Sequence, residues 1–304
     1  MQDKTSGRLG PGADDALASL SSPKIDGAVR KAHLTNTIKH WTQRHVTLPL
    51  ERHLLRRWQQ QSLGADRIFK WGLPRHAMLE TLGDALTLHV DPRALIRIVG
   101  WRNTPKRPSS SAFIWDGQWD LQREDLRRGP RYRFISELDE HRDDLEQTAA
   151  YQRFMHCIEA GKPWQSHQQG VLLDTPERIK RYLQVYIGFL DTMAVEGFDT
   201  SKGKDTVGIA IGREGTLLKI NRGLHRLAMA QRVGLPTIPV QVQCVHRDWW
   251  QQVTQGHRGH AALARISDAI AHCSPETHPG PNDVEPSLPW AEDDWPPRRT
   301  STQP

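Results

Sequence analysis

The clearest periodic pattern of apolar side chains lies between Thr175 and Gly197. Thr175-Pro176-Glu177 supplies a capping hydroxyl, a proline suited to the first helical position and an acid in the first turn. Apolar residues then recur along one helical face, at Ile179, Leu183, Ile187, Leu190 and Ala194. Glycine commonly ends a helix, so the pattern predicts a helix that closes at Gly197.

Shorter apolar runs follow this helix and alternate with turns. Residues 207–211 and 216–220 have the pattern of two strands, and residues 238–245 have that of a third. A polar break at Asn221-Arg222-Gly223 precedes a helix expected over 224–233. This alternation of helices and strands predicts an α/β (α+β) fold.

The first half of the chain carries weaker signals. Residues 34–91 fit two or three short helices. Further on, Asp116-Gly117 separates an apolar run ending at Trp115 from Gln118-Trp119, which predicts a β-hairpin because Asp-Gly tolerates a type I′ turn. The two tryptophans fit stacking on a ligand ring, but packing in the core is the favoured interpretation.

Composition shifts indicate the domain organisation. Residues 1–33 contain few large apolar side chains, and residues 273–304 are acidic and rich in proline, so both are predicted to be disordered tails. Between them we expect an α+β region over 34–150, which includes the hairpin, and an α/β domain over 151–272.

Charge and composition narrow the function classes. The 304 residues carry a formal net charge of +6, and no stretch approaches the ~18 apolar residues of a membrane helix, so we expect a cytoplasmic protein without membrane contact. The three cysteines are widely spaced, which predicts reduced thiols and no metal site. Residues 93–133 hold ten Lys or Arg against four Asp or Glu, so a nucleic-acid partner is considered for this segment.

The loop at residues 221–226 carries the best candidate chemistry. Free backbone N–H groups and the helix dipole favour an anion where the helix begins after Gly223. His225 and Arg226 lie in its first turn, within reach of the same anion. The pattern predicts a phosphate-binding loop, whereas each residue taken alone also fits an ordinary turn.

The residues Asn221-Arg222-Gly223-Leu224-His225-Arg226, followed by Gly234 and Ile238-Pro239-Val240, resemble the core of the ParB/sulfiredoxin superfamily. The resemblance covers residues 175–245 and implies a G-x-H-R loop that holds nucleotide phosphates. Leu224 stands where sulfiredoxins have a catalytic cysteine, which argues against sulfinic-acid reduction. Only residues 248–272 separate the core from the tail, which argues against the DNA-binding and dimer modules of partition proteins.

The expected function is therefore nucleotide binding through residues Asn221 to Arg226, with ATP or CTP and Mg²⁺ as the implied ligands. Within it, phosphotransfer would use His225 and Arg226 to stabilise charge on the transferring group. The catalytic base is left open among Glu196, Asp199, Asp205 and Glu214. The alternatives are a regulatory or nuclease-like factor that binds nucleic acid through residues 93–133, and a structural interaction domain without a ligand.

Overall fold

The computed structural model describes residues 16–101, 107–202, 206–220, 222–283 and 295–298. Within them, seven strands form one mixed sheet, in the order β1-β9-β7-β8-β2-β4, and β3 pairs with β9 as well. The strands of this sheet are β1 Thr87–Val90, β2 Arg97–Val99, β3 Ile114–Trp115, β4 Arg123–Asp125, β7 Val207–Ile211, β8 Leu217–Lys219 and β9 Ile238–His246. A separate hairpin joins β5 Trp164–Ser166 to β6 Val171–Leu173.

The centre of the sheet comes from the segment with the clearest apolar pattern. Strand β7 pairs in parallel with β9 and antiparallel with β8, and all of its residues are buried. In β9 buried residues alternate with partly buried ones from Ile238 to Gln243, as expected for a strand with one face on the core. Strand β2 extends the sheet by pairing in parallel with β8.

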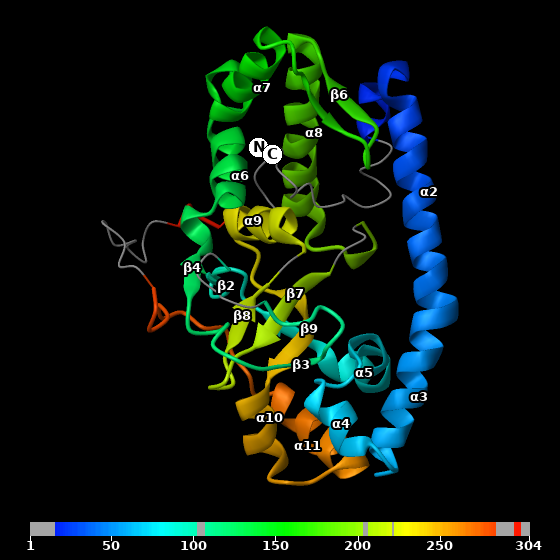
Figure 1. The fold of residues 1–304 in the computed structure, drawn as a ribbon. Coiled ribbons are helices and arrows are strands. Elements are labelled where there is room, and N and C mark those ends of the chain that lie inside the picture. Colours follow the sequence, from blue (N-terminus) through cyan, green and yellow to red (C-terminus); the bar gives the residue numbers. More distant parts are fainter. Residues whose placement is uncertain (1–15, 102–106, 203–205, 221, 284–294, 299–304) are drawn as a thin grey trace.

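Helices surround the sheet on several sides (Figure 1). Their bounds are α2 Asp26–Thr42, α3 Leu48–Gln59, α4 Ala65–Lys70, α5 Arg75–Leu82, α6 Pro130–Glu140, α7 Ala149–Glu159, α8 Pro176–Glu196, α9 Leu224–Val233, α10 Arg247–Thr254 and α11 Gly259–Ile270. Helix α9 crosses the ends of α6 and α8, which project away from the sheet, and α10 and α11 lie at the opposite end of the molecule. Helices α2 and α3 form one long rod along an edge.

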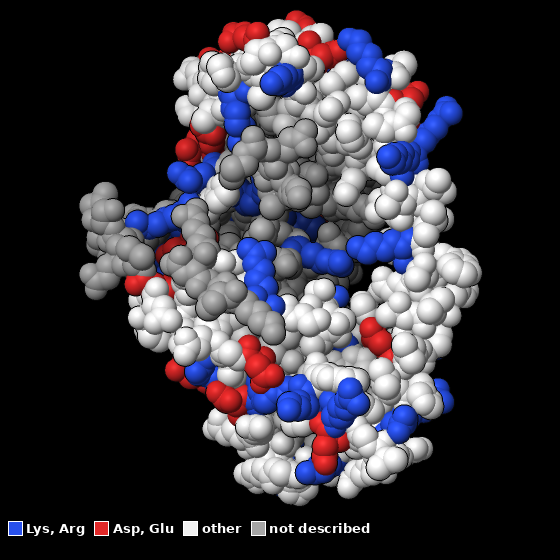
Figure 2. Space-filling model, in the orientation of Figure 1, with Lys and Arg blue, Asp and Glu red and all other residues white. Residues whose placement is uncertain are grey.

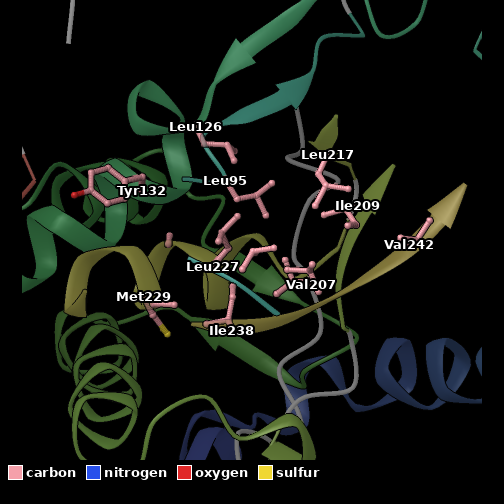
Figure 3. Packing of buried hydrophobic residues seen from close by; sticks show 14 of the residues in the cluster. Leu95, Leu126, Tyr132, Val207, Ile209, Leu217, Leu227, Met229, Ile238 and Val242 are labelled. Carbon is pink, nitrogen blue, oxygen red and sulfur yellow. The ribbon is translucent and has the colours of Figure 1, made fainter. Parts of the chain in front are cut away.

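The core has two parts, separated by the sheet. The larger part lies under α9, where Val207, Ile209 and Leu217 of the sheet meet Leu227 of the helix (Figure 3). The smaller part contains Ala210, Leu218 and Cys244 of the sheet, together with Trp115 of β3 and Trp119 of the loop that follows it. Strand β7 thus buries both of its faces, which explains its continuous apolar sequence.

The structure confirms the α/β fold class and the main elements expected in the second half of the chain. Helix α8 begins one residue after Thr175, whose side-chain oxygen accepts a hydrogen bond from the N–H of Arg178, and it ends before Gly197. Strands β7, β8 and β9 and helix α9 lie where the pattern placed them. These elements were predictable because their apolar spacing and end signals are local.

The hairpin predicted at Asp116-Gly117 is wrong. Strand β3 pairs in parallel with β9, with Trp115 opposite His246, and the residues after Gly117 form turns rather than a return strand. The backbone hydrogen bonds that the hairpin would supply are made instead with a distant strand. The packing interpretation of the tryptophans is confirmed, because Trp115 and Trp119 are 6% and 1% exposed, and their rings meet edge to face at 5.4 Å.

The tails are shorter than predicted. Leu17 and Leu20 are each 1% exposed and α2 begins at Asp26, so the prediction of a flexible segment up to residue 33 is wrong from residue 16 onward. At the other end Glu276 is buried and pairs with Arg123, with a distance of 2.9 Å between Oε2 and Nη1. Residues 1–15, 284–294 and 299–304 lie outside the described residues.

The expected division of the chain near residue 150 also differs from the structure. Strands β1, β2, β3 and β4 precede that point, whereas β7, β8 and β9 follow it, and all belong to one sheet. Helix α6 precedes it too, yet it packs on α9. Strands from both sides of residue 150 pair with each other, although the composition of the sequence indicated two separate regions.

No helix in the described part of the chain is both long enough and apolar enough to cross a membrane.

Candidate functional site

The loop before α9 has an unusual backbone. Strand β8 ends at Lys219, and the helix begins at Leu224, with Gly223 as its N-cap residue at φ +70°. A Cβ atom at Gly223 would lie 3.0 Å from both the carbonyl oxygen of Thr206 and the Cα of Val207. Glycine is therefore required here both for its left-handed conformation and for the close approach of β7. Asn221 lies outside the described residues.

The side chains that follow Gly223 contact different parts of the fold. Leu224 packs against the main core. Arg226 lies over the ring of Phe198 at 4.1 Å and donates a hydrogen bond to the carbonyl oxygen of Asp199. Burial lowers the pKa of the Arg226 guanidinium. The predicted pair of His225 and Arg226 therefore does not converge on one point, because Arg226 packs against the segment after α8.

Positive charge gathers around the start of α9. The Lys219 side chain is fully buried, and its ammonium group donates to the carbonyl oxygens of Ile220 and Arg222. Arg75 lies near Arg222, and burial first and the charge of Arg222 second lower the pKa of Arg75. The Nε of Arg75 is buried and has no hydrogen-bond partner among the described residues. This electrostatic setting favours an anion.

His225 lines a cavity of about 610 Å³, whose other lining residues come mainly from α6, α7 and α8. Its ring centroid lies 6.2 Å from that of Phe134 and 5.5 Å from that of Tyr186. The aromatic side chains of the wall are Phe134, Phe154, Trp164, Tyr182, Tyr186 and His225. In Figure 1 helices α6, α7 and α8 lie above α9. We call this cavity the aromatic pocket.

The polar groups of the aromatic pocket are mainly basic. Its lining includes the three arginines Arg131, Arg133 and Arg153 and the two glutamates Glu137 and Glu140. Both glutamates have partners already, because Glu137 accepts from the N–H of Ala149 at 2.7 Å and Glu140 accepts from Arg232 at 2.9 Å. The lining therefore has three guanidinium groups against two carboxylates, and one of these carboxylates is paired with Arg232.

Two tyrosines of α8 form the polar part of the pocket wall. Tyr182 and Tyr186 lie one helical turn apart, and their hydroxyl oxygens are 3.2 Å from each other. Burial raises the pKa of both phenols, so both are neutral at physiological pH. The pair can therefore donate and accept hydrogen bonds without carrying charge.

Sequence reasoning missed most of this pocket. Tyr182 and Tyr186 have the i, i+4 spacing of one helix face, but so do the aliphatic residues of the same helix, and spacing does not distinguish a cavity wall from a core. Phe134 and Arg153 come from α6 and α7, which the sequence placed outside the candidate domain or at its edge. The available signal was the recurrence of aromatic and basic residues in three separate segments.

The basic segment 93–133 is less available than its composition indicates. Four of its arginines are tied to other groups of the fold: Arg93, Arg97, Arg123 and Arg127. Arg123 and Arg127 are only 6% and 9% exposed. Arg102 and Lys106 lie outside the described residues. A nucleic-acid contact through this segment stays a prediction, with fewer arginines free for it than the sequence indicates.

The candidate bases that the structure describes are not among the lining residues of the aromatic pocket. Glu196 pairs with Lys202, Asp199 accepts hydrogen bonds from Ser201, and Asp205 lies outside the described residues. Glu214 is exposed, 3.8 Å from Arg123. Among the described residues, no group of three or more His, Cys, Asp or Glu side chains is placed to hold a metal ion.

His246 is part of the fold rather than a catalytic group. Its Nδ1 accepts a hydrogen bond from the N–H of Asp248 and caps α10, while its Nε2 lies 2.9 Å from the carbonyl oxygen of Gly117. The neighbouring Trp249 and Trp250 are 5% and 1% exposed. Both tryptophans belong to the main core, where α10 packs on β9 and β3.

Comparison of the chain with models of known protein families, with curated proteins and with solved structures gives no match.

Proposed function

We propose that this protein binds a nucleotide, with the ring of the base in the aromatic pocket and the phosphates on its arginines. One observation carries the proposal: His225, which belongs to the loop predicted to bind phosphate, lines a cavity with aromatic walls and three arginines. A volume of about 610 Å³ lies within the range of small-molecule sites. The ParB/sulfiredoxin resemblance supports the same class of ligand.

The chemistry of the walls fits a planar ring. Aromatic side chains stack on any base, and such stacking contributes about 1–3 kcal/mol per base. The rings of Tyr186 and Phe134 meet edge to face at 5.1 Å, and the ring of His225 on α9 is near both of them. The neutral hydroxyl pair beside them can bond to the edge of a base.

The arginines supply the complementary charge. Guanidinium groups bind phosphate oxygens in a bidentate manner, and such bonds are stronger than those between neutral groups. Arg153 is exposed at the pocket and its guanidinium lies 5.0 Å from the ring of Phe154. This geometry presents a cation beside the aromatic wall, as a phosphorylated nucleoside requires.

The proposal is limited to binding. Phosphoryl transfer requires a group that orients the acceptor, and the candidate carboxylates that the structure describes are held at other places. Phosphotransfer with Mg²⁺ therefore remains an expectation from the resemblance alone.

Calorimetric titration tests the proposal with ATP, CTP, adenosine and pyrophosphate, each with and without Mg²⁺. We expect at least one nucleotide to bind. His225→Ala should lower the affinity for that nucleotide about tenfold, which corresponds to the loss of one stacking contact of about 1.4 kcal/mol. Arg153→Ala should lower the affinity for the nucleotide more than the affinity for the nucleoside. The matched control is His260→Ala, an exposed histidine on α11.

Two outcomes of the titration would contradict the proposal. If no nucleotide binds, the proposed function is wrong. If a nucleotide binds with the same affinity to wild type, His225→Ala and Arg153→Ala, with unchanged circular dichroism, the aromatic pocket is not its site.

A further inference from the structure

Helix α2 differs from the other long helices of the fold because none of its residues is buried. Large apolar side chains are nevertheless exposed on it and on the turns that follow. Leu34, Ile38 and Trp41 are 62%, 55% and 59% exposed, and Val46 and Leu50 are 53% and 57% exposed. Of the eight large apolar residues that the structure shows as exposed, five lie in this one segment. Scattered apolar residues need no explanation, but a concentration of them does.

The backbone aligns these five residues along one side. The first three follow helical spacing, with steps of four and three residues. The next step, from Trp41 to Val46, is five residues long, and it spans the π-helical turn Gln43–Thr47. A π turn takes up more residues per turn than an α-helix, so it keeps Val46 and Leu50 near the side that Trp41 faces. We call this set of five residues the α2 stripe.

Charge indicates what would cover the α2 stripe. Between Asp26 and Leu50 the chain has four Lys or Arg residues, at Arg30, Lys31, Lys39 and Arg44, and Asp26 as its one acid. All four basic side chains are exposed. Figure 2 shows Lys and Arg side chains projecting along the edge that α2 occupies in Figure 1. A partner with negative charge would complement this edge.

A second copy of the same helix would bring like charges together. Pairing two α2 segments places an excess of three positive charges against an identical excess, and such juxtaposition is unfavourable. Nucleic acid would satisfy the charge but would leave most of the apolar side chains without partners. An amphipathic helix satisfies both features, since its apolar side chains meet the stripe and its acids meet the flanking lysines and arginines.

We propose that the α2 stripe is a docking surface for an acidic amphipathic helix of another protein. Trp41 lies at the middle of the stripe and has the residue type most enriched among the dominant contacts of interfaces. The proposal does not depend on nucleotide binding, because the aromatic pocket is lined by other elements.

Fluorescence anisotropy with the full chain tests the proposal. The probe is a labelled synthetic helix about three heptads long, with leucine at the a and d positions and glutamate elsewhere. We expect it to bind at least tenfold more tightly than the same peptide with lysine in place of glutamate. Ile38→Ser with Trp41→Ala should weaken binding at least tenfold, and Lys39→Glu with Arg44→Glu should reverse the preference between the two peptides.

Val195→Ser is the matched control, because Val195 is 78% exposed on α8, outside the stripe, and its substitution should leave binding unchanged. Equal binding of both peptides, or no loss in the stripe variant, would overturn the proposal. Two further measurements can do so as well. A dimer in sedimentation that Ile38→Ser abolishes would assign the stripe to a second copy, and tighter binding of single-stranded DNA that depends on Lys39 and Arg44 would assign it to nucleic acid.

Discussion

Substituting Gly223 by alanine tests whether the loop before α9 depends on close backbone packing. The left-handed conformation of an alanine costs about 1–2 kcal/mol. The added Cβ at Gly223 also lies 3.0 Å from two backbone atoms, the oxygen of Thr206 and the Cα of Val207, which cannot rotate away. Overpacking of this kind costs about 1–3 kcal/mol, so we expect a total loss of about 2–5 kcal/mol in the free energy of unfolding.

Gly161 provides a control with nearly the same backbone. Its φ of +67° also lies in the left-handed region, but a Cβ there would meet no atom within 4 Å. Gly161→Ala should therefore show only the conformational cost of about 1–2 kcal/mol. Urea unfolding followed by circular dichroism measures both variants. If both lose the same free energy, the close approach of β7 to the loop contributes nothing, and the reasoning about Gly223 is wrong.

Two further predictions concern the smaller core and its buried charges. Trp119→Ala should lower the free energy of unfolding by about 3–5 kcal/mol in urea, because the ring is 1% exposed; a loss below about 1 kcal/mol would contradict its place in the core. Burial raises the pKa of Asp120, but hydrogen bonds from Arg213 outweigh this and hold the pKa below its usual value. The stabilisation from Asp120 is therefore complete above the unfolded pKa of about 3.9, and it is lost as pH falls through the folded pKa. Urea midpoints at several pH values should fall more steeply in acid for wild type than for Asp120→Asn; parallel curves would refute the assignment.

Local sequence determined the elements with strong periodicity and end signals. The helix after Thr175, the strands on either side of Gly215 and the helix after Gly223 all follow from spacing, capping residues and turn residues within a few positions of each other. The burial of Trp115 and Trp119 was predictable as well, because large aromatic side chains contribute most when they are removed from water.

The tertiary structure decided which distant segments meet, and local patterns do not contain that information. Strand β3 pairs with β9 instead of forming a hairpin, and the segment predicted to be a flexible tail contains the buried Leu17 and Leu20 and the start of α2. The contacts of His225 with rings of α6 and α8 likewise depend on how these two helices pack on α9. A sequence specifies which faces must be buried, whereas the contacts between those faces depend on long-range packing. For this reason the position of the loop before α9 was predictable from the sequence, and the aromatic pocket was not.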